Sequence, residues 1–438
     1  MKKLKSYFIK TFGCTHNIAD SQKISELFFA MNINPVIEEV ADLVIVNSCG
    51  VKTNTEQKIL AYLEKIGKNE RKVIITGCLP FIDRNILQKI EDLVPKFIAI
   101  IHPINISHLE DIINAFNEKS VAGIVIDRDL APKIEKSKIL IRSQDSPVGI
   151  LQISEGCIGN CSFCATKNAR GIYHSFPMED LKGQLEIFFE QKKKEIWLTS
   201  QDCGINVNNS NVFFDLCDFI SKRPEAVLVR IGMINPEQIM KDINKFLRIF
   251  ESEKFYKFLH IPIQSANNRI LQLMKRRYDN EDLAYIFSYF RETFPQFAIA
   301  TDIITGYPDE KQSEFQDTLD FLQKYNPDVT NVSKFSSRPG TLARQSKPLD
   351  SKIVKERSKR AAELVSQISY ERNSKWVGWE GQVLLNEIGK NNSIMGRNPY
   401  YKCIVVNEGK IGDLIYAKIV AAKKNFCLGT IIGNEKGL

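Results

Sequence analysis

Three cysteines at CxxxCxxC spacing carry the strongest chemical signal in this 438-residue chain, and we name them the loop triad: Cys157, Cys161 and Cys164. They follow residues 148–153, whose apolar alternation predicts a strand, and Gly156 and Gly159 let the backbone wrap closely enough for three thiolates to converge. Three thiolates around a four-iron cluster leave one iron without a protein ligand. The alternatives are core thiols or a closed zinc site, which needs a fourth ligand and finds only His174 nearby.

Three further cysteines each follow a predicted strand, and we name them the strand-end triad: Cys14, Cys49 and Cys78. The strands are predicted at residues 7–11, 41–46 and 72–75, with helices at 18–31 and 53–68 between them. In a parallel α/β sheet the carboxyl ends of the strands gather along one edge, where ligands bind. The topology therefore brings these thiols together, and three ligands again indicate a cluster with one open iron. The alternative is three buried core thiols.

The loop triad resembles the signature of the radical S-adenosylmethionine (SAM) enzymes, and the strand-end triad resembles the N-terminal domain of the methylthiotransferases. The resemblance to methylthiotransferases covers essentially the whole chain in the family's domain order. It implies two 4Fe–4S clusters, one on the loop triad that binds SAM and an auxiliary one on the strand-end triad. It also implies that Asn17 and Asn47 give polar support around the sulfurs of the auxiliary cluster.

From residue 148 to about residue 339 the sequence again alternates strands and helices. Further strands are predicted at residues 195–199, 226–231, 258–263, 298–304 and 329–335. With the strand before the loop triad they make six βα units, a partial parallel barrel whose functional groups collect at the C-terminal mouth. The resemblance implies that residues at these strand ends bind SAM or face the substrate: Ser200, Gln201, Asp202, His260, Gln264, Ser265, Thr305 and Gly306. For each of them the alternative is ordinary hydrogen bonding at a strand end.

The final part of the chain changes to short strands separated by glycines. Strands are predicted at residues 383–386, 401–406, 414–419 and 426–432, and this spacing suits a small antiparallel β-barrel. The region resembles the TRAM module, a small barrel found on RNA-modifying enzymes. Cations and aromatic rings on such a barrel can bind single-stranded RNA. The residues expected to do so are Lys390, Arg397, Tyr400 and Lys402. The alternative is a structural cap with solvated lysines.

The chain is therefore predicted to be an α/β protein with three domains and one linker. They are an N-terminal parallel α/β domain with the auxiliary cluster (1–130), a linker (131–147), a radical SAM core built as a partial (β/α)6 barrel (148–372), and a TRAM-like RNA-binding domain that is a small antiparallel β-barrel (373–438). The formal net charge of +8 is compatible with a polyanionic partner. No apolar run reaches the length of a membrane span, and no signal peptide or lipid anchor is evident, so we expect a cytoplasmic protein with no membrane partner.

The residues after the loop triad favour one branch of the family. Lys167 and Asn168 stand where the bacterial branches usually have a Pro-Tyr pair, and the run resembles the archaeal and eukaryotic branch that acts on N6-threonylcarbamoyladenosine in tRNA. The resemblance implies insertion of a methylthio group at that adenosine, at position 37 beside the anticodon. A SAM-derived radical would take hydrogen from a C–H bond, and the auxiliary cluster would carry the sulfur. The implied partners are the tRNA anticodon loop, an electron donor and a sulfur donor.

Three other functions stay open at this point. The first is methylthiolation of isopentenylated adenosine in tRNA, and the second is methylthiolation of a ribosomal protein side chain. The basic, aromatic-bearing terminal segment argues against the second. The third is an iron–sulfur protein that binds RNA without catalysis.

Overall fold

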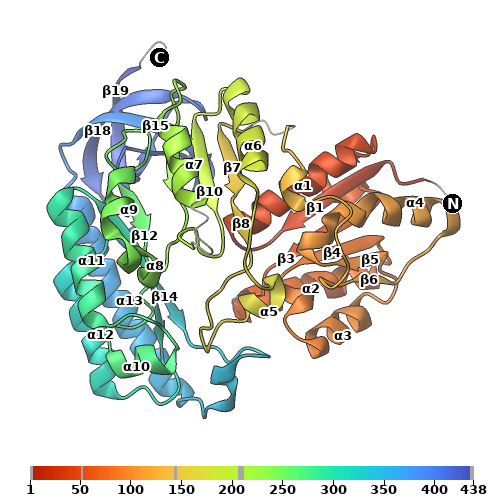
Figure 1. Cartoon of the computed structure of the whole chain (residues 1–438), viewed down its shortest axis with the longest axis horizontal. Helices are drawn as coiled ribbons and strands as arrows, with labels where there is room; N and C mark the ends of the chain where they lie inside the picture. Colours follow the sequence, from red (N-terminus) through yellow and green to blue (C-terminus); the bar gives the residue numbers. More distant parts are fainter. Residues whose placement is uncertain (1–2, 51–52, 143–145, 206–211, 435–438) are drawn as a thin grey trace. The chain divides into compact units, whose positions relative to one another are not determined.

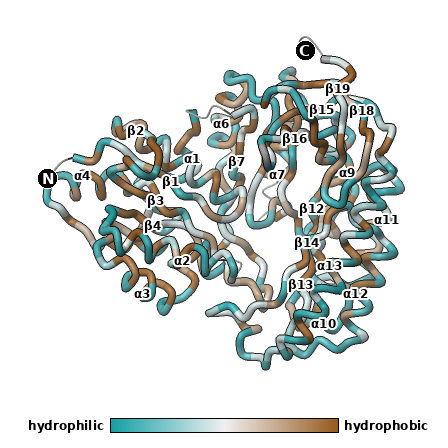
Figure 2. Tube along the Cα trace, turned by 180° about the vertical axis from the view of Figure 1, so that it is seen from behind, coloured by the Kyte–Doolittle hydropathy of each residue, from teal (hydrophilic) through white to brown (hydrophobic). Residues whose placement is uncertain are grey.

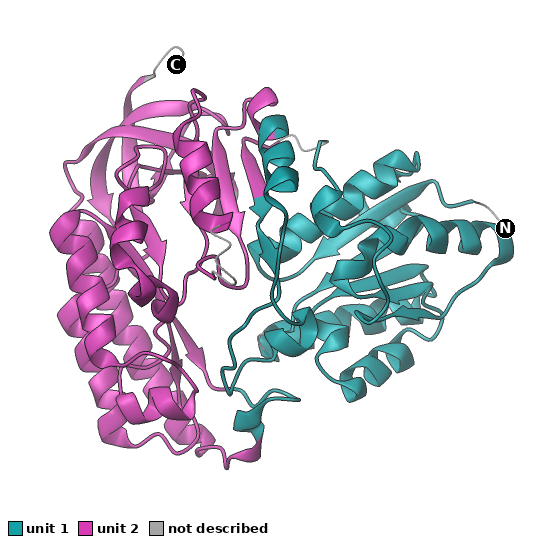
Figure 3. Cartoon of the chain, in the orientation of Figure 1, with its two compact units in different colours: residues 1–145, 151–187, 336–344 teal, residues 146–150, 188–335, 345–438 magenta. Residues whose placement is uncertain are grey.

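The computed structural model describes residues 3–50, 53–142, 146–205 and 212–434. The chain forms two compact units (Figure 3). The first contains Met1–Asp145, Leu151–Ile187 and Ser336–Arg344, and the second contains Ser146–Ile150, Phe188–Phe335 and Gln345–Leu438. Both cysteine triads belong to the first unit. The domain bounds expected from the sequence stay a prediction, and residues 143–145 of the expected linker lie outside the described residues.

A parallel six-stranded sheet forms the centre of the first unit, with the order β2-β1-β3-β4-β5-β6 (Figure 1). Its strands are β1 (Ser6–Thr11), β2 (Asn34–Pro35), β3 (Leu43–Ser48), β4 (Val73–Gly77), β5 (Ala99–Ile101) and β6 (Ile124–Ile126). The intervening helices are α1 (Thr15–Ala30), α2 (Thr53–Lys68), α3 (Arg84–Leu93) and α4 (Leu109–Lys119), with short 3-10 turns η1 (Glu38–Val40), η2 (Leu79–Phe81), η3 (Pro103–His108) and η4 (Lys136–Lys138). The predicted parallel α/β sheet is confirmed.

Burial explains why these segments form a sheet covered by helices. Every residue of β3 and β4 is buried, as expected for central parallel strands with both faces covered. Helix α2 buries Ile59, Leu63 and Ile66, which are spaced four and three residues apart and so lie on one face. Each such side chain contributes about 1.5–3 kcal/mol when it leaves water. The strand order changes direction between β1 and β3, and in sheets of this kind ligands bind at such a point.

A short segment of the first unit carries the loop triad. Strands β8 (Ser154–Glu155) and β9 (His174–Ser175) pair antiparallel, and they enclose the three cysteines and helix α5 (Thr166–Arg170). Helix α6 (Met178–Glu190) follows, and the turn η5 (Leu342–Gln345) lies at the end of the last segment of this unit. The Ala343 N–H donates to Ser162 O at 2.8 Å, so this last segment packs directly on the cysteine loop.

The second unit contains the remaining βα repeats. Its strands are β10 (Glu195–Thr199), β11 (Leu228–Ile231), β12 (Phe258–His260), β13 (Ala298–Thr305) and β14 (Val329–Lys334), and β7 (Val148–Gln152), whose residues divide between the two units, precedes them in sequence. They form two sheets, β11-β10-β7 and β12-β13-β14, and single parallel bridges at Val229–Phe255 and Met233–His260 connect them. All six predicted strands are present, but β12 ends at His260 because Pro262 follows closely.

Helices cover the outside of these strands. They are α7 (Val212–Ser221), α8 (Pro236–Lys241), α9 (Ile243–Ile249), α10 (Asn268–Leu273), α11 (Asn280–Thr293), α12 (Gln312–Tyr325) and α13 (Ser351–Ser374). Along α11 and α12 hydrophilic and hydrophobic residues alternate with the helical repeat (Figure 2), so each helix turns one apolar face to the strands. Within the described ranges no helix is both long and apolar enough to span a bilayer.

The chain ends in a closed five-stranded barrel with the order β15-β16-β17-β19-β18. Its strands are β15 (Glu380–Ile388), β16 (Ile394–Arg397), β17 (Cys403–Val406), β18 (Leu414–Ala422) and β19 (Cys427–Asn434), with the turn η6 (Lys390–Asn392). The predicted small barrel is confirmed, with two differences. The sequence did not indicate β16, which contains Gly396 and is followed by Asn398 and Pro399. In addition, β17 and β19 pair in parallel, so the barrel is not wholly antiparallel.

Candidate iron–sulfur site and cofactor surface

The strand-end triad assembles at one edge of the six-stranded sheet. Cys14 precedes α1, Cys49 follows β3 and Cys78 follows β4. Cys14 is exposed, whereas the other two are buried. Burial raises the pKa of the Cys78 thiol to about 11, and the neighbouring Cys14 and Cys49 add to this rise, so the three sulfurs act on one another electrostatically. A thiol so difficult to ionise becomes a thiolate ligand when a metal supplies the compensating charge.

Two glycines and two asparagines hold these loops in place. Gly77 has φ +91°, and a Cβ there would lie 2.1 Å from Ser48 O; at Gly13 a Cβ would lie 3.1 Å from Cys49 Sγ. Asn17 is fully buried, and its Nδ2 donates to Ser48 O at 2.9 Å while its Oδ1 lies 3.7 Å from Cys14 Sγ. Asn47 Nδ2 donates to Asn17 O at 2.7 Å. Asn17 therefore reaches a cysteine sulfur, and Asn47 supports it from behind.

The loop triad is assembled by local backbone geometry. The Gly159 N–H donates to Cys157 Sγ at 3.2 Å, and the Cys164 N–H donates to Cys161 O at 3.1 Å. A Cβ at Gly159 would lie 3.2 Å from Cys157 Sγ and 3.9 Å from Cys161 Sγ, so a glycine suits a loop in which both sulfurs face inward. Three partly exposed thiols gathered in one loop fit a 4Fe–4S cluster with one open iron.

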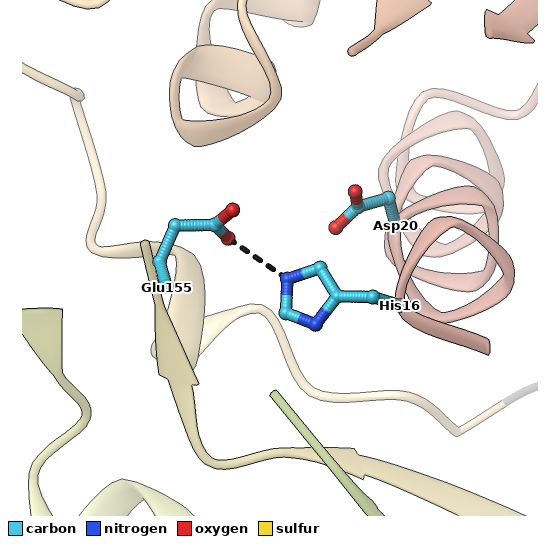
Figure 4. Close-up of side chains that lie close together, drawn as sticks. All are labelled: His16, Asp20 and Glu155. Carbon is cyan, nitrogen blue, oxygen red and sulfur yellow. Dashed lines mark hydrogen bonds and ion pairs between the residues drawn. The ribbon is translucent and has the colours of Figure 1, made fainter. Parts of the chain in front are cut away.

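A buried set of charged side chains lies beside the strand-end triad, and the sequence did not indicate it. His16 and Asp20 come from α1 and Glu155 from β8 (Figure 4). Their ligand atoms lie within 4.8 Å of one another, which resembles a metal site. However, Lys136 and Arg170 each form ion pairs with both carboxylates, so two cations already balance two anions. We therefore assign these side chains to charge pairing. We name the group of His16, Asp20, Glu155, Lys136 and Arg170 the buried ion cluster.

Burial also sets the protonation of the histidine in this cluster. His16 is 2% exposed, its Nε2 lies 3.2 Å from Glu155 Oε2, and burial lowers its pKa below the ordinary value. Glu155 immediately precedes the first glycine of the cysteine loop and Arg170 immediately precedes Gly171, which ends α5 with φ +80°. The sequence signal that could have indicated this cluster is a charged residue directly before a glycine near the cysteine motif, as at Glu155 and Arg170.

The first unit contains a cavity of about 560 Å³ that residues next to both triads line. Pro80 follows Cys78 by two residues, and Asn160 lies between the first two cysteines of the loop triad. The other lining residues are Phe81, Ile82, Asp83, Arg84, Leu87, Asp127, Arg128, Asp129, Lys167, Asn168, Gly171 and Ile172. Lys167 and Asn168, which favoured one branch of the family, thus line a space adjoining both cysteine loops.

Comparison with known proteins gives two family matches. Residues 6–98 match "Uncharacterized protein family UPF0004", and residues 151–322 match the "Radical SAM superfamily". The chain is 34% identical to the probable threonylcarbamoyladenosine tRNA methylthiotransferase of Archaeoglobus fulgidus, over 98% of this chain and 99% of the relative. It is 29% identical to the threonylcarbamoyladenosine tRNA methylthiotransferase of Drosophila melanogaster, over 98% of this chain and 78% of the relative. The chain belongs to the threonylcarbamoyladenosine tRNA methylthiotransferase family.

Solved structures agree with the fold of this methylthiotransferase family member. The radical SAM methyltransferase TsrM of Kitasatospora setae, with cobalamin and a [4Fe-4S] cluster bound, has a TM-score of 0.54 at 12% identity and covers 78% of this chain and 77% of its own. The cobalamin-dependent radical SAM enzyme OxsB has a TM-score of 0.52 and covers 83% of this chain and 56% of its own. Membership of the radical SAM superfamily implies SAM and one 4Fe–4S cluster, and the loop triad lies inside the matched residues.

Three of the residues expected to bind SAM in this family member lie in the loop after β10, where side chains hydrogen-bond to backbone N–H groups. Asp202 is buried and its Oδ1 accepts from the Gly204 and Asn235 N–H groups, both at 3.2 Å. Burial raises its pKa to about 6. Ser200 Oγ accepts from the Asp202 N–H at 3.3 Å, and Gln201 beside them is partly exposed. These residues shape the loop after β10, and their contact with SAM stays a prediction.

The other residues expected to bind the cofactor fall into two groups. One belongs to a row of polar side chains on neighbouring strands, which we name the polar row, and the others are buried or form backbone hydrogen bonds. His260 Nε2 lies 2.9 Å from Asp302 Oδ2, and Asn331 Nδ2 donates to Asp302 Oδ1 at 2.8 Å, so β12, β13 and β14 carry a row of polar side chains that the sequence indicated only at His260. Gln264 has φ +66° and bonds to β13 through its backbone. Ser265, Thr305 and Gly306 are buried, and a Cβ at Gly306 would lie 2.6 Å from the side chain of Val354.

The four residues of the terminal barrel that are expected to bind RNA differ in their exposure. Lys402 is 5% exposed, and its ammonium donates to Asp328 Oδ1 at 2.7 Å. Tyr400 packs on Trp376 with ring centroids 5.1 Å apart, and the Arg397 guanidinium lies 4.8 Å from the ring centroid of Tyr401. Lys390 alone of the four is exposed. A buried carboxylate thus holds Lys402, whereas Arg397 and Tyr400 are partly exposed. Contact of these four residues with RNA stays a prediction.

Proposed function

We propose that this chain inserts a methylthio group into N6-threonylcarbamoyladenosine of tRNA, at the adenosine beside the anticodon. Relatives carrying this activity in their names match along 96–98% of the chain. The observation that carries the proposal is the pair of separate cysteine triads in one compact unit. A single triad would suffice for radical formation alone, whereas a methylthio transfer also needs a place for sulfur.

The loop triad is proposed to hold the cluster that binds SAM, and the strand-end triad to hold a second 4Fe–4S cluster. When bound, these groups supply a SAM-derived radical for hydrogen abstraction and an open iron for sulfur. The chain's own contribution is placement. The Gly159 N–H bond orients the Cys157 sulfur, and Asn17 and Gly77 fix the loops of the strand-end triad. The cavity beside both loops offers space for the reacting base.

The polar row on β12, β13 and β14 is proposed to face SAM or the substrate. His260 and Asp302 are 19% and 28% exposed, so they are neither core residues nor fully solvated. Each holds the other in one orientation, which favours binding because little side-chain freedom is lost when a ligand arrives. Gln201 and Gln264 are the other partly exposed candidates from the sequence.

The tRNA is proposed to contact the exposed cations of the terminal barrel. Lys390, Lys418, Lys423 and Lys424 are exposed and come from different parts of the barrel. Such cations bind phosphates without regard to sequence, and a base in an anticodon loop is already unpaired, so little unstacking is needed to present it. An electron donor and a sulfur donor must act from outside the chain, and we place the reaction in the cytoplasm.

Mass spectrometry of tRNA nucleosides tests this proposal. A strain that lacks the gene should accumulate N6-threonylcarbamoyladenosine without its methylthio derivative, and the wild-type gene should restore the derivative. Loss of methylthiolated isopentenyladenosine instead would assign the other tRNA substrate. An unchanged nucleoside profile would contradict the proposal and favour a protein substrate or an RNA-binding role without catalysis.

A further inference from the structure

The two cations of the buried ion cluster make the same ion pairs, but Arg170 makes two further hydrogen bonds. Lys136 and Arg170 are each at most 2% exposed, and both bridge Asp20 and Glu155. Arg170 Nη1 lies 2.7 Å from Asp20 Oδ2 and 2.9 Å from Glu155 Oε1. Lys136 and Arg170 therefore contribute equally to balancing the charges of the two carboxylates. A second cation with the same partners therefore serves as an internal reference for the first.

Arg170 differs from Lys136 by a hydrogen bond to a cysteine sulfur. Its Nε donates to Cys78 Sγ at 3.1 Å, and its Nη2 donates to Asn17 Oδ1 at 2.9 Å. That oxygen is also the one 3.7 Å from Cys14 Sγ. The rigid guanidinium fork thus reaches two carboxylates, one amide and one sulfur at once, which a lysine ammonium on a flexible stem cannot reproduce.

The chain fixes Arg170 in this position from the side of the loop triad. Helix α5 begins at Thr166, two residues after Cys164, and Arg170 is its last residue. Ala165 and Ala169 pack in the same hydrophobic core as Cys49 and Cys78. Arg170 therefore belongs in sequence to the loop triad and in space to the strand-end triad.

We propose that Arg170 is a positioning residue for the auxiliary cluster: by donating to the Cys78 sulfur it raises the reduction potential of that cluster and ties its ligand to the loop triad. This inference rests on the proposed auxiliary cluster of the strand-end triad. A donor on a ligand sulfur and a buried positive charge both stabilise the more negative, reduced cluster, and hydrogen bonds to sulfur are among the determinants of cluster potential. Lys136 also carries one positive charge and forms ion pairs with the same two carboxylates, Asp20 and Glu155.

The test measures the auxiliary cluster in isolation within the full-length chain. Replacing Cys157, Cys161 and Cys164 by Ala leaves only the strand-end triad, and iron and sulfide analysis first establishes that a cluster is present. Midpoint potentials are then determined by electron paramagnetic resonance in redox titrations. Arg170→Gln is compared with the matched Lys136→Gln, because each removes one cation from the buried ion cluster and the first also removes the hydrogen bonds to Cys78 Sγ and Asn17 Oδ1. Arg170→Lys keeps the charge and loses the fork.

We expect Arg170→Gln to lower the reduced-to-oxidised ratio of the cluster about tenfold at a fixed potential, which corresponds to 59 mV for one electron. Lys136→Gln should change that ratio less than threefold. If Arg170→Gln fails to fold, Arg170→Lys provides the test, and we expect it to lower the midpoint potential of the cluster as well. Equal potentials in the parent and in the Arg170 variants that fold would overturn the role of Arg170 while leaving the auxiliary cluster standing. Absence of iron from the triple cysteine variant would overturn both.

Discussion

The two cysteine triads reach similar chemistry by opposite routes. The loop triad lies within eight residues of sequence, and its geometry comes from one loop with a glycine between the first two sulfurs. The strand-end triad spans residues 14 to 78, and a whole parallel sheet is needed to bring its members together. The first triad therefore depends on local backbone conformation, and the second depends on global folding. Damage to the sheet should remove one cluster and spare the other.

The largest expected effect separates the triads by function. Cys157→Ala should abolish SAM cleavage to 5′-deoxyadenosine, because a cluster with two thiolates cannot present one open iron reliably. Cys14→Ala should leave cleavage measurable but reduce methylthiolation of tRNA to background. Anaerobic assays with SAM and a reductant, followed by nucleoside mass spectrometry, measure both. Full product formation by Cys14→Ala would remove the difference in role between the triads.

The next effect tests the dependence of the strand-end triad on the sheet. Gly77→Ala should destabilise the protein by about 3 kcal/mol or more, since it adds a strained φ of +91° to a backbone clash next to Cys78. Gly183→Ala in α6 is the matched control, because a Cβ there meets nothing within 4 Å and alanine favours a helix. Denaturant unfolding and iron content measure the outcome. If Gly77→Ala kept both clusters and full stability, the triad would not need this turn.

A third prediction concerns the buried carboxylate of Asp328, which lies in the second unit, and tests whether its loss affects the cysteine triads of the first unit. Burial alone raises the pKa of Asp328, but Lys402, Arg372 and Arg291 lower it to about 2. Its folded pKa thus lies below the ordinary value, so its stabilisation is present above about pH 4 and is lost as the pH falls through 2. At pH 7 this amounts to about 2 kcal/mol.

Asp328→Asn should therefore lower stability at pH 7 by about 2 kcal/mol or more and flatten its dependence on pH between 4 and 2. Iron content should not change, since Asp328 belongs to the second unit and both triads to the first. Urea unfolding at several pH values and iron analysis measure these quantities. Loss of iron in this variant would mean that the triads respond to general destabilisation rather than to their own loops.

The smallest expected effect concerns RNA. Replacing Lys423 and Lys424 by Ala should weaken tRNA binding several-fold and reduce the slope of log affinity against log salt by about 2, or about 1 for each lysine, without altering either cluster. Lys96→Ala is the control, because Lys96 is also exposed but lies in the first unit and pairs with Glu70. Fluorescence anisotropy at several salt concentrations measures both. An equal loss in the control would assign binding to overall charge.

Short-range rules were enough to predict much of the fold from the sequence. Short runs of apolar and β-branched residues located β1, β3, β4 and β10 to within about two residues, and α2 has the predicted bounds. The cysteine spacing predicted the loop triad, and the position of one cysteine after each of three strands predicted the strand-end triad. The buried ion cluster was out of reach, because Asp20, Lys136, Glu155 and Arg170 are far apart in sequence and only the folded chain pairs them. Likewise Lys402 is an ordinary surface lysine in sequence, and only Asp328 explains why it is buried.

Counting iron in anaerobically purified protein tests the central claim most directly. We predict about eight irons per wild-type chain, and about four in each of two variants that replace one complete triad by alanine. About four irons in the wild type, with none remaining once the loop triad is replaced, would contradict the presence of two clusters.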